Sequence, residues 1–474
     1  MNKYCLFVFL ILVLGGCKKK INPTSDKAQC TVVFTNVDST TNLTLVVYSA
    51  LNAQRFRASR DSMGFATFKI PGINHGMVSI QKPNVSFNNA FVTNGDTVRI
   101  EIMSDGKETF FAFEGDKASH YNFSRKCRQA VSKYQKFSGD IILYKASCKR
   151  RFQERKSFLK DFVVNNEVSS EFEDYLNTMF KYEYLYELTI PLSKITTEEL
   201  QSVDKNYFED TKIADFDDES ILNSTMYSIA LNSYLGYYIT QSYKGFEGGD
   251  EFEKHFQTIT DQLTGRVREY AYTALIDTYY LNLLPDNIVM LNDYMDTAKS
   301  LVKDTAFSKK LEKIHKKLLR LNKPLPDSIK NIGLMGLDDK TTSLGTILAQ
   351  NKANTIVVDN WASWCWACFM DMENAQEFKD QVVKDGVKWI YISIDQAKDV
   401  DKWREKSREK QHLGLMVNQY LVDGNDLNMY NEYFGTIEGI PRYLFFNVKG
   451  ELTLSEGPRP TDSVAFGKVI GQLK

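Results

Sequence analysis

The spacing of apolar residues changes twice along the chain, and this change constrains the fold more than any other feature. Over residues 30–116 apolar and polar residues alternate, as at Val32 and Phe34, which is typical of half-buried β-strands. Over residues 117–322 the spacing lengthens to that of helices, and over 327–474 short apolar runs alternate with helical patterns. The sequence therefore predicts a multidomain protein with an N-terminal all-β domain, an α-helical middle region and a C-terminal α/β domain.

Turn residues support the β-rich prediction for the first of these regions. Asp61-Ser62-Met63-Gly64, Asn94-Gly95-Asp96 and Asp105-Gly106 separate the apolar runs at the intervals of a β-sandwich. The stretch D-S-M-G-F-A-T-F, followed later by V-T-N-G-D-T-V-R-I, resembles the small β domain of unknown function that precedes thioredoxin-like domains in envelope lipoproteins. We therefore expect a β-sandwich-like domain over residues 30–116.

Two clusters in the helical region could be read as binding surfaces. Tyr182, Tyr184 and Tyr186 are predicted to belong to the core, because aromatic residues in helical segments are usually buried. A basic cluster is predicted to form a solvated helix face. Its members are Lys149, Arg150, Arg151, Arg155, Lys156 and Lys160. The clearest linker is Lys323-Pro324-Leu325-Pro326.

Composition excludes several classes of function. The chain has 59 Lys and Arg residues against 60 Asp and Glu residues, so it carries no net positive charge that would attract nucleic acid. Nucleic acid is therefore not expected as a partner. The five histidines lack metal-ligand spacing, and neither G-x-x-x-x-G-K-[ST] nor G-x-G-x-x-G occurs. We therefore expect neither a zinc hydrolase nor a nucleotide-dependent enzyme.

The N-terminus predicts export. Leu6–Leu14 is an unbroken apolar run behind Lys3, and it is far shorter than the roughly 20 residues of a spanning helix, so residues 1–16 are predicted to be a signal peptide. The next residues, Leu14-Gly15-Gly16-Cys17, resemble the bacterial lipobox. The resemblance implies cleavage before Cys17 and lipid on that residue, with 17–29 as a lipidated linker. The alternative is an ordinary signal peptide with an incidental Cys17.

A lipid on Cys17 implies a location in the cell envelope, facing the periplasm, with the membrane as a partner. In some Gram-negative bacteria an Asp after the lipidated Cys resembles a retention signal for the inner membrane. Lys18 occupies that position, which favours the outer membrane. This compartment permits disulfides.

A pair of cysteines follows the strongest apolar run of the C-terminal region. Residues 355–359 are predicted to form a buried strand, and Cys365 and Cys368 open the helical pattern that comes after it. Unpaired backbone N–H groups at the start of a helix favour a thiolate, so Cys365 is the expected nucleophile. Cys368 lies one turn further on and can resolve a mixed disulfide on Cys365.

The segment D-N-W-A-S-W-C-W-A-C resembles the active site of thioredoxin-like thiol-disulfide oxidoreductases of the TlpA/ResA-like branch, over residues 327–474. The resemblance implies that Cys365 attacks, Cys368 resolves and Asp359 relays a proton. Gly439-Ile440-Pro441-Arg442 matches the cis-proline loop of the family, which faces the disulfide. The predicted catalytic residues are Cys365, Cys368, Asp359 and Pro441, and the predicted substrate contacts are Trp364, Trp366 and Ile440.

The predicted function is thiol-disulfide exchange between Cys365-Cys368 and protein thiols or disulfides of the periplasm. An unidentified redox donor or acceptor is a further partner, and no cofactor beyond this disulfide is expected. The alternative is a client-binding lipoprotein with a redox-inactive thioredoxin fold. Half a zinc site is disfavoured because no second ligand pair occurs, and a peroxidase because Ala362 stands where a Thr is needed.

The sequence departs from the family pattern in two places. Trp366-Ala367 replaces the common Gly-Pro, which leaves open whether the pair reduces or oxidises its clients. Asp371-Met372-Glu373 replaces the usual Glu-x-Pro. Because the proline is missing, we expect the helix after Cys368 to lack its usual kink.

Three cysteines remain between the lipobox and the C-x-x-C pair: Cys30, Cys127 and Cys148. Cys127 and Cys148 could join two helices through a disulfide, or each could be a buried thiol. The sequence leaves both options open.

Overall fold

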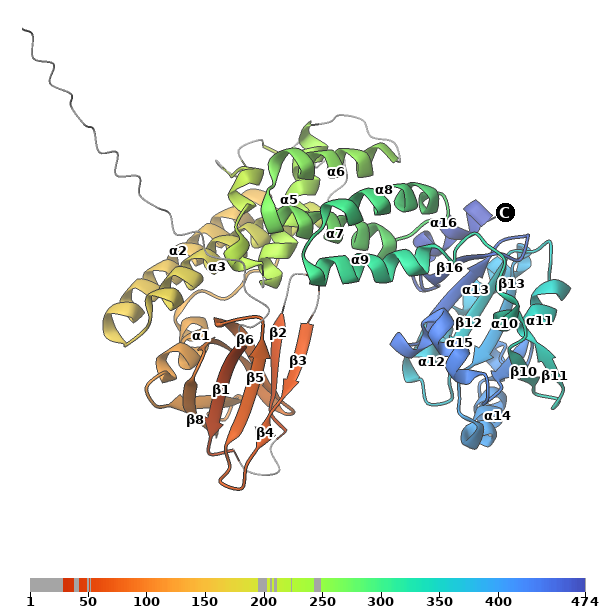
Figure 1. Ribbon diagram of the computed structural model, residues 1–474, viewed down its shortest axis with the longest axis horizontal. Coiled ribbons are helices and arrows are strands. Elements are labelled where there is room, and N and C mark those ends of the chain that lie inside the picture. Colours follow the sequence, from red (N-terminus) through yellow and green to blue (C-terminus); the bar gives the residue numbers. More distant parts are fainter. Residues whose placement is uncertain are drawn as a thin grey trace, which may run out of the picture. The chain divides into compact units, whose positions relative to one another are not determined.

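The computed structural model describes residues 29–473 apart from 38–41, 49–50, 52, 195–202, 205–206, 209–210, 223 and 243–248. The predicted signal peptide and Cys17 lie outside the described residues. The chain divides into two compact units (Figure 1). Unit 1 extends to Lys194 and includes Ser220–Ala230, whereas unit 2 holds the described residues between Lys194 and Ser220 and those from Leu231 onward. The domain boundaries given above stay a prediction.

Unit 1 contains two β-sheets that share one core. The first sheet has the order β4 (Ser59–Arg60), β5 (Ala66–Pro71), β1 (Gln29–Thr35), β8 (Asp96–Ser104) and β9 (Thr109–Glu114). The second has the order β3 (Ala53–Arg57), β2 (Thr44–Tyr48), β6 (His75–Lys82) and β7 (Val85–Thr93). In β1, Cys30, Val32 and Phe34 are buried and the residues between them are partly exposed. Buried residues of both sheets form a single hydrophobic cluster, as in a sandwich.

Three helices follow the sheets of unit 1: α1 (Ala118–Ala130), α2 (Ile141–Asn165) and α3 (Ser170–Thr189). Asp140 caps α2 by accepting hydrogen bonds from the backbone N–H groups of Ile142 and Leu143, and the Ser169 side chain caps α3. Tyr182 and Tyr184 are buried in α3, in agreement with the core prediction, whereas Tyr186 is only half-buried.

The basic cluster of α2 is not a wholly solvated face, so that prediction is wrong for two of its members. Arg151 pairs with Glu187 at 2.8 Å and Arg155 with Glu183 at 2.7 Å, both across to α3. Residues four apart lie on one face of a helix, and here the two pairs face each other. The helix opposite supplies the partners.

Unit 2 begins with helices and ends with a mixed sheet. The helices are α5 (Thr225–Ser242), which belongs to unit 2 from Leu231, then α6 (Gly249–Gln262), α7 (Gly265–Leu281), α8 (Asn287–Leu301) and α9 (Thr305–Leu318). After α9 the predicted linker packs on the sheet, because Lys323 forms a β-bridge with Leu452 and Leu325 is buried.

The sheet of unit 2 has seven strands. Their order is β11 (Thr341–Ser343), β10 (Gly333–Gly336), β14 (Gln419–Val422), β13 (Lys388–Ser393), β12 (Ile356–Trp361), β15 (Arg442–Phe446) and β16 (Leu452–Gly457) (Figure 1). Strand β12 pairs in parallel with β13 and antiparallel with β15. The accompanying helices are α10 (Asp327–Lys330), α11 (Leu344–Gln350), α12 (Trp366–Asn374), α13 (Gln376–Lys384), α14 (Val400–Glu409), α15 (Leu427–Phe434) and α16 (Ser463–Leu473).

The predicted fold class is confirmed, since strands dominate the N-terminal region, helices the middle and a mixed α/β sheet the C-terminal region. None of the helices in the described part of the chain combines the length and apolar character needed to cross a membrane.

The helix after Cys368 is interrupted, which corrects the expectation drawn from the missing proline. Ala375 separates α12 from α13 and has φ −109° and ψ 7°, away from helical values. Different tertiary contacts fix α12 and α13. Asp371 of α12 pairs with Arg459, while Phe378 of α13 packs edge-on against Phe466 of α16.

Candidate active site

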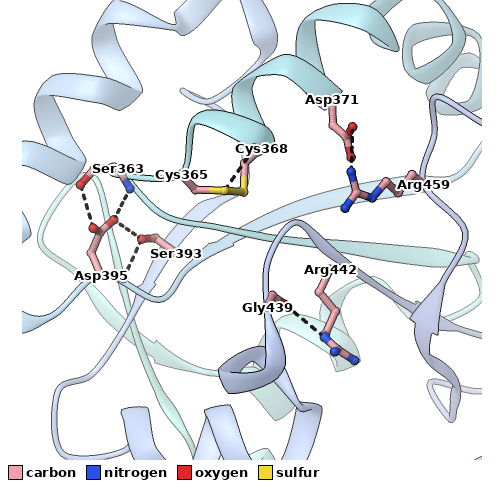
Figure 2. The surroundings of a disulfide bond; sticks show 9 residues. All are labelled: Ser363, Cys365, Cys368, Asp371, Ser393, Asp395, Gly439, Arg442 and Arg459. Atoms are coloured by element: carbon pink, nitrogen blue, oxygen red, sulfur yellow. Dashed lines mark hydrogen bonds and ion pairs between the residues drawn. A yellow bond between two sulfur atoms is a disulfide. The ribbon is translucent and has the colours of Figure 1, made fainter. Parts of the chain in front are cut away.

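The two cysteines of the C-x-x-C segment form a disulfide at the start of α12. Cys365 is the N-cap residue of this helix, and its sulfur is bonded to that of Cys368 (Figure 2). The backbone N–H of Cys368 donates to Cys365 Sγ at 3.1 Å. Such a donor favours the thiolate form once the disulfide is reduced. Cys365 retains 5% exposure and Cys368 retains none, so Cys365 is the more accessible residue of the pair.

Two exposed tryptophans flank Cys365. Trp364 is 65% exposed and Trp366 is 73% exposed, whereas Trp361 at the end of β12 is fully buried. Large exposed aromatic side chains are uncommon on a monomer and mark surfaces that bind other molecules. The two predicted substrate contacts of this segment therefore stand beside the disulfide with open faces.

A buried aspartate holds the loop in front of Cys365. Asp395 accepts hydrogen bonds from the backbone N–H of Ser363 at 2.8 Å, the Ser363 hydroxyl at 2.7 Å and the Ser393 hydroxyl at 2.6 Å (Figure 2). These donors satisfy a carboxylate that has no exposed surface. Asp395 was not predicted from the sequence. Its position just after the apolar run of β13 could have indicated it, because the carboxyl ends of parallel strands meet at one edge of a sheet.

Asp359 lies in the middle of the buried strand β12. It is 1% exposed, and neither of its carboxyl oxygens has a hydrogen-bond partner among the described residues. Burial raises the pKa of Asp359 to about 8. The indole of Trp389 and the ammonium of Lys379 oppose the rise, and the carboxyl of Asp371 adds to it. Asp359 therefore holds a proton near neutral pH.

A second buried carboxyl group of this region belongs to Asp371, which lies on α12. Burial raises its pKa, and the neighbouring Arg459 lowers it. Arg459 Nη1 lies 3.5 Å from Asp371 Oδ1, while Oδ2 has no partner in the part of the chain that the structure describes (Figure 2). Sequence analysis treated Asp371 only as a departure from a motif. Its charge acts on Asp359, so it belongs to the electrostatics of this site.

The Gly439–Arg442 segment, which we call the proline loop, lies at the same edge of the sheet. Its Ile440–Pro441 peptide bond is cis. Arg442 is opposite Asn360 in the β12–β15 register, and Asn360 Nδ2 donates to the Arg442 carbonyl oxygen at 2.9 Å. Ile440 and Pro441 are half-buried. Figure 2 shows Gly439 and Arg442 in the surroundings of the disulfide.

The structure thus brings Cys365, Cys368, Trp364 and Trp366 together at one edge of the sheet of unit 2, with Asp359 in the adjoining strand and Ile440 and Pro441 in the proline loop. Their roles stay predictions. Cys127 and Cys148 are free and buried, so no bridge joins them, and Cys30 is likewise a free buried thiol.

Comparisons with known proteins address this region. Residues 325–451 match the AhpC/TSA family. Similar solved structures include the thioredoxin domain of a thiol-disulfide oxidoreductase from Bacteroides vulgatus, at 17% identity over 30% of this chain and 93% of that chain, with a TM-score of 0.25. A thioredoxin-like protein from Bacteroides caccae is 15% identical over 59% of this chain and 96% of its own, with a TM-score of 0.37. No curated protein has significant similarity to the chain.

The raised pKa of Asp359 predicts how stability depends on pH. The folded state binds this proton up to about pH 8, whereas an unfolded Asp releases it near 3.8, so wild-type stability falls as pH rises through this window. We expect Asp359→Asn to remove this loss. Its stabilising effect should be near zero at pH 4 and grow by up to roughly 1.4 kcal/mol per pH unit until about pH 8.

Urea unfolding of the oxidised protein, followed by tryptophan fluorescence, measures this effect, because all five tryptophans lie in the C-terminal region. Asp401→Asn is the control, since the Asp401 side chain is fully exposed. A stability difference between Asp359→Asn and wild type that did not change from pH 4 to 8 would contradict the prediction.

The five described cysteines should differ sharply in reactivity. Burial raises the pKa of Cys30 and Cys148 to about 12 and that of Cys127 to about 11, so these thiols stay protonated and shielded. In the reduced native protein, iodoacetamide at neutral pH should label Cys365 first. Timed quenching and peptide mass spectrometry give the order, and labelling in urea is the control. Equal rates at Cys365 and Cys368 would count against this assignment.

Proposed function

Because the C-terminal region is an AhpC/TSA thioredoxin-like domain, we propose that the protein is a thiol-disulfide oxidoreductase that exchanges its Cys365-Cys368 pair with protein clients of the periplasm. The observation that carries the proposal is the disulfide at the N-terminus of α12, in which Cys365 keeps 5% exposure and has an exposed tryptophan on each side of it in the chain. A pair built only for stability would not need these open aromatic faces.

In the reducing direction the exchange has two steps. The Cys365 thiolate attacks one sulfur of a client disulfide, and the other client sulfur leaves as a thiolate and takes up a proton. Cys368 then loses its proton and attacks the Cys365 sulfur. The Cys365-Cys368 disulfide forms, and the client leaves as a dithiol with two electrons gained. An external donor must then reduce the pair, and the oxidising direction reverses each step.

We assign the proton of the second step to Asp359. Cys368 is fully buried, so water cannot readily take its proton, and a carboxyl group with a pKa of about 8 can both accept and return a proton near neutral pH. The family resemblance implies that this acid lies beneath the pair, and this position is part of the proposal. Burial is the main cause of the raised pKa of Asp359, and the nearby carboxyl group of Asp371 adds to it.

The rival proposal is a client-binding protein whose thioredoxin fold is redox-inactive. In that protein the disulfide would be structural, and the two tryptophans would only hold a client. The buried Asp359 favours exchange, because a carboxyl group without a hydrogen-bond partner among the described residues is costly to the fold unless it serves chemistry.

We further propose that lipid on Cys17 anchors the protein in the cell envelope, with the C-terminal domain facing the periplasm and the outer membrane as the favoured site. The support is the L-G-G-C segment followed by Lys18. A protein client and a redox donor or acceptor would then meet the pair in a compartment where disulfides form.

Cys368→Ser should trap clients. Without the resolving thiol the mixed disulfide on Cys365 persists, so incubation of the reduced variant with insulin should give a covalent adduct that dithiothreitol releases. With dithiothreitol added as the electron donor, wild-type protein should instead reduce insulin with turnover, and Cys365→Ser should neither trap insulin nor speed its reduction. Non-reducing electrophoresis and insulin turbidity measure both effects. A wild-type rate no higher than that of Cys365→Ser would support the redox-inactive rival.

Cys17→Ala should abolish the anchor. Lipid on a cysteine is the only attachment proposed for this chain, so the variant should move from the membrane fraction to the soluble fraction. Fractionation of expressing cells with a high-salt wash measures this, and Cys30→Ala is the matched control, because Cys30 is a buried thiol of β1. A Cys17→Ala protein that still pelleted after the wash would refute the anchor.

A further inference from the structure

Helix α9 contacts the segment that leads into the proline loop. Lys313 Nζ lies 2.9 Å from Glu438 Oε1, and Lys317 Nζ lies 2.8 Å from Glu438 Oε2. The two lysines are four residues apart and share one face of the helix. Both oxygens of one carboxylate are therefore bound by cations from an element outside the α/β sheet. Glu438 directly precedes Gly439, the first residue of the proline loop.

The other end of the proline loop joins the same charge cluster. Arg442 is buried, and its guanidinium lies 3.6 Å from Glu438 and 3.2 Å from Glu456. Arg442 also donates to the Ser455 carbonyl oxygen at 3.3 Å, and Lys317 lies 3.8 Å from Glu456. Three cations and two carboxylates thus fix both ends of a short loop. A network of this kind is stronger than an isolated surface pair, because several charges share the cost of ordering.

The electrostatics of Glu438 show that the cations dominate. Burial alone would raise its pKa, but hydrogen bonds from Lys317 and Lys313 lower it to about 2. A second contact lies two residues beyond the end of α9. There Arg320 donates to the Tyr433 carbonyl oxygen at 2.9 Å, and its guanidinium lies 4.7 Å from the centre of the Tyr433 ring. The C-terminal part of α9 and the residues after it are therefore bound to both Tyr433 and Glu438, which precede the proline loop.

The contact of α9 with Glu438 matters because the proline loop lies at the edge of the sheet that carries the disulfide. The start of β15 and the end of β12 meet at one edge of the sheet, because the strands are antiparallel with Arg442 opposite Asn360. The disulfide follows the end of β12 by a few residues. A shift of the proline loop would change the space in front of the disulfide without moving either sulfur.

We propose that α9 is a positioning element for the proline loop, and that Lys313 and Lys317, acting through Glu438, are positioning residues for protein substrates. This inference rests on the proposed exchange function. Ile440 is a substrate contact implied by the family resemblance, so we infer that a protein substrate lays its backbone along the proline loop, whereas a small disulfide needs only the sulfur of Cys365. Loosening the loop should therefore impair the first kind of substrate and spare the second.

The test compares two substrates in the full-length protein. For the double variant Lys313→Ala/Lys317→Ala we expect kcat/KM for insulin to fall about three- to tenfold, mainly through KM, as loss of a partly buried ion-pair network would give. The rate with dipyridyl disulfide, which has no backbone to pair, should stay within about twofold of wild type. Lys316→Ala is the matched control, because Lys316 lies on the same helix and pairs with Glu312 at the surface.

Two further measurements separate positioning from damage to the fold. Lys317→Arg keeps the cation and should retain wild-type insulin kinetics. Hydrogen exchange should rise in peptides covering residues 436–441 of the double variant and stay unchanged in β12. Glu438→Gln should reproduce the insulin defect and add little to the double variant, since both changes remove the ion pairs of Glu438 with Lys313 and Lys317.

Equal losses with both substrates, or an unchanged insulin rate in the double variant, would overturn the positioning role while leaving the exchange function intact. Wild-type protein that reacted with neither substrate would overturn the proposed function, and this inference with it.

Discussion

Strand β12 determines the geometry of the candidate active site. All six of its residues are buried, and it is paired on both sides, in parallel with β13 and antiparallel with β15. This pairing brings the end of β12, the end of β13 and the start of β15 to one edge of the sheet. The disulfide, Asp395 and the proline loop occupy those three positions. A register shift of one residue in β12 would turn Asp359 to the opposite face, so the site depends on this pairing.

Three buried aspartates near this edge illustrate how partners decide the role of a charge. Asp395 accepts three hydrogen bonds and serves to hold the loop in front of Cys365. Asp359 accepts none among the described residues, so burial leaves it protonated near neutral pH and available for proton transfer. Asp371 is intermediate, because the positive charge of Arg459 partly offsets the effect of burial on its pKa. Residue type and burial are the same in all three, and only the surrounding donors differ.

The role of a charged helix face likewise depends on the partners that it meets in the folded protein. Lys313 and Lys317 of α9 and Arg151 and Arg155 of α2 are each spaced four apart, and the spacing by itself predicts only a common face. The first pair binds Glu438 beside the proline loop, and the second meets two glutamates of α3. Sequence analysis could find the faces but not their partners, because the partners are more than 25 residues away along the chain. For this reason it treated the basic cluster of α2 as solvated.

The sequence by itself determined the fold class, the cysteine pair at a helix start and the buried strand that carries Asp359. These features depend on the period of the backbone and on residues within a few positions of one another, so local spacing reveals them. Only the tertiary structure decided that Asp395 orients the loop, that Cys127 and Cys148 stay free, that the helix turns at Ala375 and that α9 contacts the proline loop. Each of these depends on groups brought together by packing between distant segments, which no local spacing encodes.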